Sequence, residues 1–232
     1  MQPTDSNASA LERGWEAWRR GDMAAAIGAW TPAADGGDPE AQFQIGLLLM
    51  NLDDGQRDLA RAVQLFTEAA ENGHVEAQYS LGVVYQQGLG VEVDEAEAAY
   101  WYGRAADANH APAQCNLAGL YESGSGVSQD FLKAVELYGR AAERGYSPAL
   151  HNLGVMCENG IGLEQDHARA ATFYRLAADR GLAAAQYNLG VMLASGVGVA
   201  RDVDQARELF AKAAAVGHAL AKTNLERLQA AG

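Results

Sequence analysis

Small and apolar side chains recur three or four residues apart along most of the chain, in two separate stripes per stretch of sequence. Ala41 and Ile45 would lie on one face of a first helix, and after a polar interval Ala62, Phe66 and Ala69 would share a face of a second. Apolar residues at this spacing are typical of amphipathic helices. The pattern therefore predicts a pair of helices, which we name helix A and helix B.

The helix pair is repeated along the chain in a constant register. Helix A motifs lie in steps of 36 residues and begin at Ala41, Ala77, Ala113, Ala149, Ala185 and Ala221. Helix B motifs keep the same step and begin at Ala62, Ala98, Ala134, Ala170 and Ala206. A repeat of this length buries its apolar faces only by stacking on its neighbours. The sequence predicts an all-α solenoid of antiparallel helix pairs, with five repeats in residues 37–218.

Residues at the expected helix boundaries agree with this register. Asp38-Pro39 and Ser147-Pro148 are typical starts of A helices, with a capping side chain before a proline. Aspartates at the starts of the B helices can accept hydrogen bonds from free backbone N–H groups; they are Asp58, Asp94, Asp130, Asp166 and Asp202. Glycines just after the B helices suit the left-handed position that ends a helix; they are Gly73, Gly145, Gly181 and Gly217.

Glycines in the middle of the A helices need a separate explanation, because glycine costs about 1 kcal/mol relative to alanine there. They are Gly46, Gly82, Gly154 and Gly190. We expect close approach of the neighbouring B helix to compensate this cost. Glu226 holds the same position in the last A helix, which no B helix follows. Residues 219–232 are therefore predicted to be a C-terminal capping helix with a polar outer face.

The N-terminal region departs from the repeat. Residues 9–36 fit a shorter helix pair that resembles an ordinary tetratricopeptide repeat and caps the array. Within it, Trp15, Trp18 and Trp30 are expected to seal the core. Residues 1–8 are expected to form a disordered tail.

Charge narrows the class of partner. The 232 residues include 30 Asp and Glu but only 17 Lys and Arg, a formal charge of −13, and we expect this excess to be spread over the surface. Phosphate backbones and anionic lipids bind clustered Lys and Arg, so neither nucleic acid nor membrane is expected as the main partner. The sequence has no apolar run of membrane-spanning length and no signal peptide at its start, which favours a cytoplasmic protein.

The repeated motifs resemble those of the Sel-one-like repeat family, a branch of the tetratricopeptide superfamily. These are A-x-x-x-L-G in helix A, G-x-G-V between the helices, and A-x-x-W/L/F-Y-x-x-A-A-x-x-G in helix B, over roughly residues 37–232. The first loop departs from this pattern, with Leu52 and Asp54 in place of glycines, and is expected to be built differently. The resemblance implies a right-handed α-solenoid and a bacterial adaptor or scaffold that binds other proteins.

Catalytic, metal and cofactor sites are not expected. The G-x-G pairs, such as Gly88 and Gly90, join two helices and lack the strand that precedes a phosphate loop. Cys115 and His151 hold the same phase in successive A helices and could be neighbours, but nothing in the sequence would orient the histidine or form an oxyanion hole. Cys-rich relatives have been linked to β-lactam hydrolysis, but their paired cysteines are absent here.

The A helices line the concave face in tetratricopeptide-like arrays, so side chains at that phase are the candidate protein-binding residues. We expect Phe43, Tyr79 and Tyr187 to be its aromatic anchors. The complete candidate set is Phe43, Leu47, Tyr79, Val83, Gln86, Asn116, Glu122, His151, Asn152, Glu158, Tyr187, Asn188, Val191 and Asn224.

Two features of this face leave alternatives open. The asparagine row, Asn116, Asn152, Asn188 and Asn224, could bind an extended peptide or brace neighbouring A helices. Relatives that bind a C-terminal carboxylate use Lys and Arg at corresponding phases; here Glu40, Glu76, Glu122 and Glu158 are expected at the edge, which favours a neutral to basic segment with apolar anchors. The alternatives to such an adaptor are a self-associating module that docks through its convex face or ends and, more remotely, a hydrolase.

Overall fold

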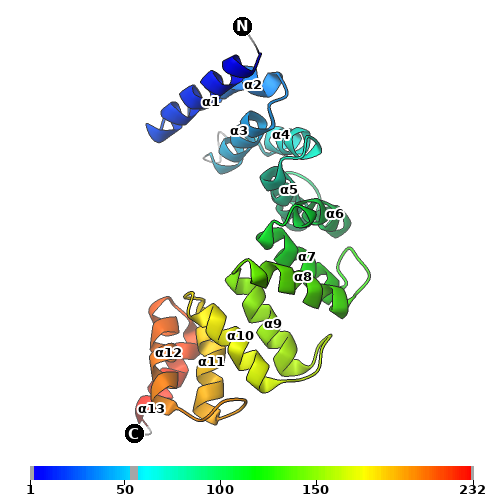
Figure 1. Ribbon diagram of the computed structural model, residues 1–232. Helices are drawn as coiled ribbons and strands as arrows, with labels where there is room; N and C mark the ends of the chain where they lie inside the picture. Colours follow the sequence, from blue (N-terminus) through cyan, green and yellow to red (C-terminus); the bar gives the residue numbers. More distant parts are fainter. Residues whose placement is uncertain (1–2, 53–56, 231–232) are drawn as a thin grey trace. The chain divides into compact units, whose positions relative to one another are not determined.

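A computed structural model describes residues 3–52 and 57–230, which form thirteen α-helices and no strand (Figure 1). The N-terminal pair is α1 (Pro3–Arg19) and α2 (Met23–Asp35). The A helices are α3 (Pro39–Asn51), α5 (Val75–Gln87), α7 (Ala111–Ser123), α9 (Ser147–Asn159), α11 (Ala183–Ser195) and α13 (Ala219–Ala230). The B helices are α4 (Leu59–Glu71), α6 (Glu95–Asp107), α8 (Phe131–Glu143), α10 (His167–Ala178) and α12 (Val203–Ala215).

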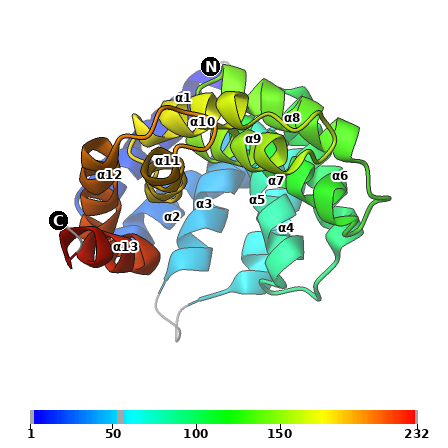
Figure 2. The same ribbon diagram turned by 90° about the horizontal axis from the view of Figure 1, so that it is seen from below.

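This architecture confirms the predicted fold class, an all-α solenoid of helix pairs (Figures 1 and 2). The start of the chain differs from the prediction, because α1 begins at Pro3 and residues 3–8 are helical instead of forming a tail. Residues 1–2 of that expected tail lie outside the described residues, as do residues 53–56 of the first interhelix loop.

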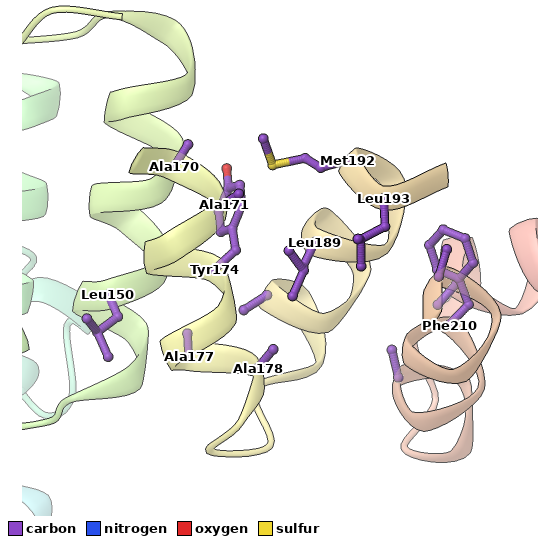
Figure 3. Packing of buried hydrophobic residues seen from close by; sticks show 14 of the residues in the cluster. Leu150, Ala170, Ala171, Tyr174, Ala177, Ala178, Leu189, Met192, Leu193 and Phe210 are labelled. Atoms are coloured by element: carbon purple, nitrogen blue, oxygen red, sulfur yellow. The ribbon is translucent and has the colours of Figure 1, made fainter. Parts of the chain in front are cut away.

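The chain divides into two compact units. Unit 1 contains residues 1–113 and 125–127, and unit 2 contains residues 114–124 and 128–232. Unit 1 has its own apolar core around Trp30, which is fully buried and donates a hydrogen bond from Nε1 to the Leu11 carbonyl at 3.1 Å. In unit 2, Tyr174 of α10, Leu189 of α11 and Phe210 of α12 belong to one buried cluster (Figure 3).

The mid-helix glycines pack against an aromatic ring of the following B helix, as the sequence predicted. A Cβ atom on Gly82 would lie 2.3 Å from the Tyr102 ring, and one on Gly154 would lie 2.5 Å from the Tyr174 ring. Gly46 and Gly190 have the same relation to Phe66 and Phe210, at 2.7 Å. A side chain at these positions would push the two helices of a repeat apart.

The interhelix glycines also have a structural role. Gly126 and Gly162 have positive φ angles of 69°. A Cβ atom on Gly126 would lie 2.2 Å from the Glu95 carbonyl carbon, and one on Gly162 would lie 2.7 Å from the Phe131 carbonyl oxygen. The second glycine of each of these loops therefore lets the backbone pass close to the start of the preceding B helix.

Helix caps follow the expected register with one exception. The carboxylates of Asp58 and Asp202, for example, accept hydrogen bonds from backbone N–H groups in the first turns of α4 and α12. Ser147 was expected to cap α9, but the helix starts at Ser147, and the N-cap residue Tyr146 makes no capping bond through its side chain. Histidines, which the sequence did not predict as caps, cap other A helices.

Candidate functional site

The three expected aromatic anchors on the A helices pack between elements of the chain itself. The ring centroids of Phe43 and His74 lie 4.6 Å apart. Those of Tyr79 and His110 lie 4.7 Å apart, and those of Tyr187 and His218 lie 4.8 Å apart. Phe43 is only 8% exposed, so little of its ring is available to a partner. Much of the predicted aromatic surface therefore serves to join one repeat to the next.

The histidines in these contacts also cap the A helices. His74 Nδ1 accepts a hydrogen bond from the Ala77 backbone N–H at 3.1 Å, so the ring proton of the neutral form lies on Nε2. That nitrogen is 3.1 Å from a Glu40 carboxylate oxygen and donates to it. His110 makes the same two contacts, with Ala113 and with Glu76. Glu40 and Glu76, expected at the edge of the groove, are thus partnered inside unit 1.

Three other candidate residues accept hydrogen bonds from tyrosines of the B helices. Glu158 accepts from the Tyr174 hydroxyl at 2.6 Å, and Glu122 accepts from Tyr138 at 2.9 Å. In unit 1, Gln86 accepts from Tyr102 at 2.8 Å. Glu122 and Glu158, which were expected at the edge of the groove, thus each accept a hydrogen bond from a largely buried hydroxyl.

A signal for this pairing was present in the sequence, 16 residues apart. Tyrosine holds one equivalent position of three B helices, as Tyr102, Tyr138 and Tyr174, and the A-helix residue 16 positions earlier is in each case an acceptor, Gln86, Glu122 or Glu158. Where the B helix has Phe66 or Phe210, that earlier residue is Met50 or Ala194. A phenyl ring has no proton to donate, so its repeat needs no acceptor.

Burial and the paired carboxylate affect the ionisation of these tyrosines. The pKa of Tyr138 is raised well above its usual range by burial and by the neighbouring charge and hydrogen bond of Glu122. The pKa of Tyr174 is raised in the same direction by burial and by Glu158. Both hydroxyls therefore remain protonated donors at physiological pH.

In unit 2, two members of the asparagine row contact neighbouring A helices. Asn188 Nδ2 of α11 lies 3.2 Å from His151 Nε2 of α9, and Asn152 Nδ2 of α9 lies 3.9 Å from Cys115 Sγ of α7. His151 Nδ1 is also 3.2 Å from Asn152 Oδ1. These contacts favour the bracing role for Asn152 and Asn188.

The same contacts weigh against a catalytic thiolate. The hydrogen bonds of His151 join it to Asn152 and Asn188. Burial, with a smaller effect from Glu122, raises the pKa of Cys115 to about 12. A thiol with this pKa is protonated at neutral pH and is a poor nucleophile. Within residues 3–52 and 57–230, His, Cys, Asp and Glu form no cluster of three or more that could hold a metal ion.

An apolar pocket of about 470 Å³ lies between α1 and α3 in unit 1. We name it the N-terminal pocket; it is lined by Trp15, Trp18, Met23, Gln44, Leu47, Leu48, Asn51 and Leu52. Trp18 was expected to seal the core, but it is 45% exposed, and its ring packs edge-on against Trp15. Leu47, a candidate binding residue, is half-buried in the same pocket.

A second pocket, of about 320 Å³, lies where the terminal helix α13 packs in unit 2. We name it the C-terminal pocket; it is lined by Val191, Ala194, Ser195, Phe210, Asn224, Arg227 and Leu228. Two candidate binding residues, Val191 and Asn224, are among them. Val83, another candidate, is half-buried on α5 in unit 1, and Asn116 is half-buried on α7 in unit 2.

Comparison with known protein families gives the chain a place among repeat proteins. The sequence profile of the Sel1 repeat matches five consecutive segments, residues 39–74, 75–110, 111–146, 147–182 and 183–218. The chain belongs to the Sel1 repeat family. Sel1 repeat proteins are generally scaffolds for protein–protein interaction. A comparison with curated protein sequences found no match.

Solved structures of other Sel1 repeat proteins have the same fold. A Sel1 repeat protein from Oxalobacter formigenes is 30% identical with a TM-score of 0.87, over 94% of this chain and 87% of that one. The protective antigen c5321 from uropathogenic Escherichia coli is 28% identical with a TM-score of 0.73, over 86% of this chain and half of that one. The immunity protein Pa5087 from Pseudomonas aeruginosa shares the fold, at 22% identity and a TM-score of 0.53, over 79% of this chain and 67% of that one.

Charge is divided unevenly between the two units of this Sel1 repeat chain. Residues 1–113 contain 18 Asp and Glu but 6 Lys and Arg, whereas residues 114–232 contain 12 and 11. Most of the negative excess that was expected over the surface therefore belongs to the residues of unit 1. None of the helices in the described part of the chain is both long and apolar enough to cross a membrane.

Proposed function

We propose that this chain is a non-enzymatic scaffold that binds a segment of another protein on the A-helix face of unit 1. The observation that carries the proposal is the N-terminal pocket, an apolar hollow of about 470 Å³ whose wall includes the half-exposed ring of Trp18. Aromatic side chains in apolar pockets supply much of the binding energy at protein interfaces. One or two large apolar side chains of the partner enter this pocket, beside Leu47.

The charge of unit 1 defines the rest of the partner segment. Acidic residues outnumber basic ones three to one in residues 1–113. A segment with Lys or Arg beside its apolar anchors is attracted to this unit, and an acidic segment is repelled. The partner is therefore a neutral to basic segment with apolar anchors. The other candidate positions on the A-helix face of unit 1, such as Tyr79 and Val83, provide secondary contacts.

Catalysis is not part of the proposed function. The buried Cys115 thiol is protonated, and the ring of His151 is held by two asparagines. A hydrolase would need an activated nucleophile with a base in reach. Loss of a measured hydrolytic activity on changing Cys115 would contradict this part of the proposal.

The test compares two matched double variants in an affinity capture from the native cell. Trp18→Ala with Leu47→Ala removes apolar contacts from the N-terminal pocket. Phe131→Ala with Leu132→Ala removes two exposed apolar side chains from α8 in unit 2. We expect the first variant to recover about tenfold less of the partner and the second to recover as much as wild type. Circular dichroism must show the same helix content for all three proteins.

Two outcomes would contradict the proposal. Equal recovery by both variants would place the binding surface outside the N-terminal pocket. Self-association that rises with protein concentration in sedimentation experiments, with no foreign partner captured, would favour a self-assembling module.

A further inference from the structure

The C-terminal pocket exists where the last repeat lacks a pair of side chains present in the repeat before it. In the fourth repeat, the Tyr174 hydroxyl and the Glu158 carboxylate meet at 2.6 Å between α9 and α10. The equivalent residues of the fifth repeat are Phe210 and Ala194, which lack the hydroxyl and the carboxylate. Both residues line the pocket of about 320 Å³. In the first repeat the equivalent of Ala194 is Met50, which is much longer.

The rim of this pocket carries a positive charge at a position that is uncharged in the other repeats. Arg227 of α13 is equivalent to Leu47, Val83, Gly119, Val155 and Val191. Indeed α3, α5, α7, α9 and α11 contain no Lys or Arg at all, whereas α13 contains Lys222 and Arg227. Arg227 is thus a cation of the A-helix series that lines the C-terminal pocket.

The polar groups at the rim are available to a ligand. Within the described residues, no carboxylate lies within ion-pair distance of the Arg227 guanidinium, and the side-chain amide of Asn224 has no hydrogen-bond partner. Ser195 is already engaged, because its hydroxyl donates to the Val191 carbonyl at 2.8 Å. A guanidinium and an amide that line one apolar pocket suit a carboxylate joined to an apolar group.

The surrounding chain favours an anion as well. Residues 201–230 contain five Lys and Arg and four Asp and Glu, in a protein whose formal charge is −13. Arg201 donates from Nε to the Ala194 carbonyl at 3.0 Å, so a second guanidinium lies next to a residue that lines the pocket. Negative charge is therefore better tolerated at this end of unit 2 than in unit 1.

We infer that the C-terminal pocket binds an acidic peptide segment, with one large apolar side chain in the pocket and a neighbouring carboxylate on Arg227. The apolar anchor contacts Val191, Ala194, Phe210 and Leu228. The carboxylate accepts from the Arg227 guanidinium and from the Asn224 amide. This site is separate from the N-terminal pocket, and neither proposal depends on the other.

Three labelled peptides test the charge preference. Each contains Leu-Phe, is acetylated and amidated at its ends, and carries glutamates, glutamines or lysines on both sides of Leu-Phe. NMR titration of the whole protein follows the Asn224 side-chain amide and gives the affinity. We expect the glutamate peptide to bind about tenfold more tightly than the glutamine peptide and the lysine peptide to bind more weakly than both. Equal affinity for the glutamate and glutamine peptides would overturn the inference.

Arg227→Gln and Lys222→Gln separate a specific contact from general electrostatic attraction. Both remove one positive charge from α13, but Lys222 does not line the pocket. We expect Arg227→Gln to weaken the glutamate peptide about tenfold and to reduce the salt dependence of its binding, whereas Lys222→Gln changes affinity less than about twofold. Equal effects of the two changes would show that the attraction is non-specific and would contradict a specific contact with Arg227.

Ala194→Met tests the pocket itself. Methionine holds the equivalent position in the first repeat, as Met50, so this substitution is compatible with the repeat fold. It should fill the pocket and abolish binding of the glutamate peptide, while Ala194→Ser, which adds one small atom, should bind it about as well as wild type. Undiminished binding by Ala194→Met, with an unchanged melting temperature, would show that the anchor does not enter the pocket.

Discussion

Unit 1 and unit 2 are built from the same repeat, but their charges and their pockets differ. Unit 1 has three acidic residues for each basic one, and its pocket between α1 and α3 is walled by tryptophans and leucines. Unit 2 has nearly equal numbers of the two charges, and its pocket carries Arg227 on the rim. Residues that hold the repeats together have thus been kept, while residues on the pocket walls have diverged.

The buried contacts explain why such divergence is tolerated. A glycine of helix A against a ring of helix B, and an acceptor for each tyrosine hydroxyl, recur in both units. Gly82, Tyr102 and Gln86 provide them in unit 1, and Gly154, Tyr174 and Glu158 provide them in unit 2. The remaining positions of the A helices can then change without altering the path of the backbone. A scaffold built in this way can present a surface that favours basic segments in one unit and a surface that favours acidic segments in the other.

The strongest expected effect tests whether the two units share their packing. Gly82→Ala and Gly154→Ala each place a Cβ atom within 2.5 Å of a tyrosine ring, so the ring must move. Each should lower the free energy of unfolding by about 1–3 kcal/mol, as overpacking of a core does. Urea denaturation of the purified proteins gives the values.

A glycine with open space around it serves as the control. Gly103 lies inside α6, and apart from its chain neighbours and the backbone of its own helix no atom lies within 4 Å of its added Cβ. Gly103→Ala should therefore stabilise the protein by about 0.5–1 kcal/mol, through the higher helix propensity of alanine. A destabilising effect at Gly82 with none at Gly154 would mean that the two units are packed by different rules.

The next expected effect is an alkaline loss of stability to which two tyrosines of unit 2 contribute. The raised pKa values of Tyr138 and Tyr174 mean that these hydroxyls lose their protons at higher pH in the folded than in the unfolded chain. Their contribution to stability is therefore complete below pH 10 and is lost as pH rises above it. Tyr138→Phe with Tyr174→Phe should reduce by roughly half the fall in urea midpoint between pH 8 and pH 11.

Two comparisons sharpen this result. Phe66 and Phe210 occupy the same position in other repeats, so phenylalanine is compatible with the fold there. Tyr100→Phe, at an exposed position of α6, removes a hydroxyl without changing the buried pairs and should leave the pH dependence as in wild type. An unchanged alkaline transition in the double variant would assign that transition to other groups. Burial raises the pKa of Cys115 as well, so part of the transition will remain.

The sequence was sufficient to predict the repeat register, the helix pairs and the packing role of glycines such as Gly82. Each of these follows from local rules, because a glycine inside a helix has a known cost that packing must offset. The roles of Glu122 and Glu158 were missed, since the helical phase does not decide whether a long side chain reaches solvent or turns back to a tyrosine. Histidine caps were missed because histidine is not among the residues that most often cap helices.

The candidate site was less predictable than the fold. The division of charge between the units depends on a boundary near residue 113 that only the structure provides. The sequence does not predict Arg227 as a binding residue, because it predicts the terminal helix to be a cap with a polar outer face. Of the predicted binding residues, Leu47, Val191 and Asn224 line pockets. Phe43 instead fills the interior, and Gln86, Glu122 and Glu158 accept hydrogen bonds from buried tyrosine hydroxyls. A position in a repeat thus predicts the face of a helix better than it predicts the use of that face.

The smallest expected effect concerns a buried glutamine near the start of helix A, which is present in every full repeat except the fourth. Gln78 Nε2 donates at 3.0 Å to the Ala70 carbonyl at the end of α4, and Gln42 and Gln186 do the same for the helices that precede them. The equivalent residue of the fourth repeat is Leu150, which is also buried.

Leucine at this position is therefore sterically acceptable, and Gln78→Leu should lose only the hydrogen bond. The Ala70 carbonyl keeps a second donor, the Gly73 N–H at 3.0 Å, so it is not left unpaired. We expect a loss of about 0.5–1.5 kcal/mol in the free energy of unfolding, measured in urea beside the isosteric Gln78→Glu. Gln78→Glu replaces the donor by a buried carboxylate that faces a carbonyl oxygen, so it should cost more at neutral pH. If Gln78→Leu cost as much stability as Gln78→Glu, leucine would not fit this position in unit 1 as it does at Leu150 in unit 2. The two units would then differ in their interior as well as on their surface.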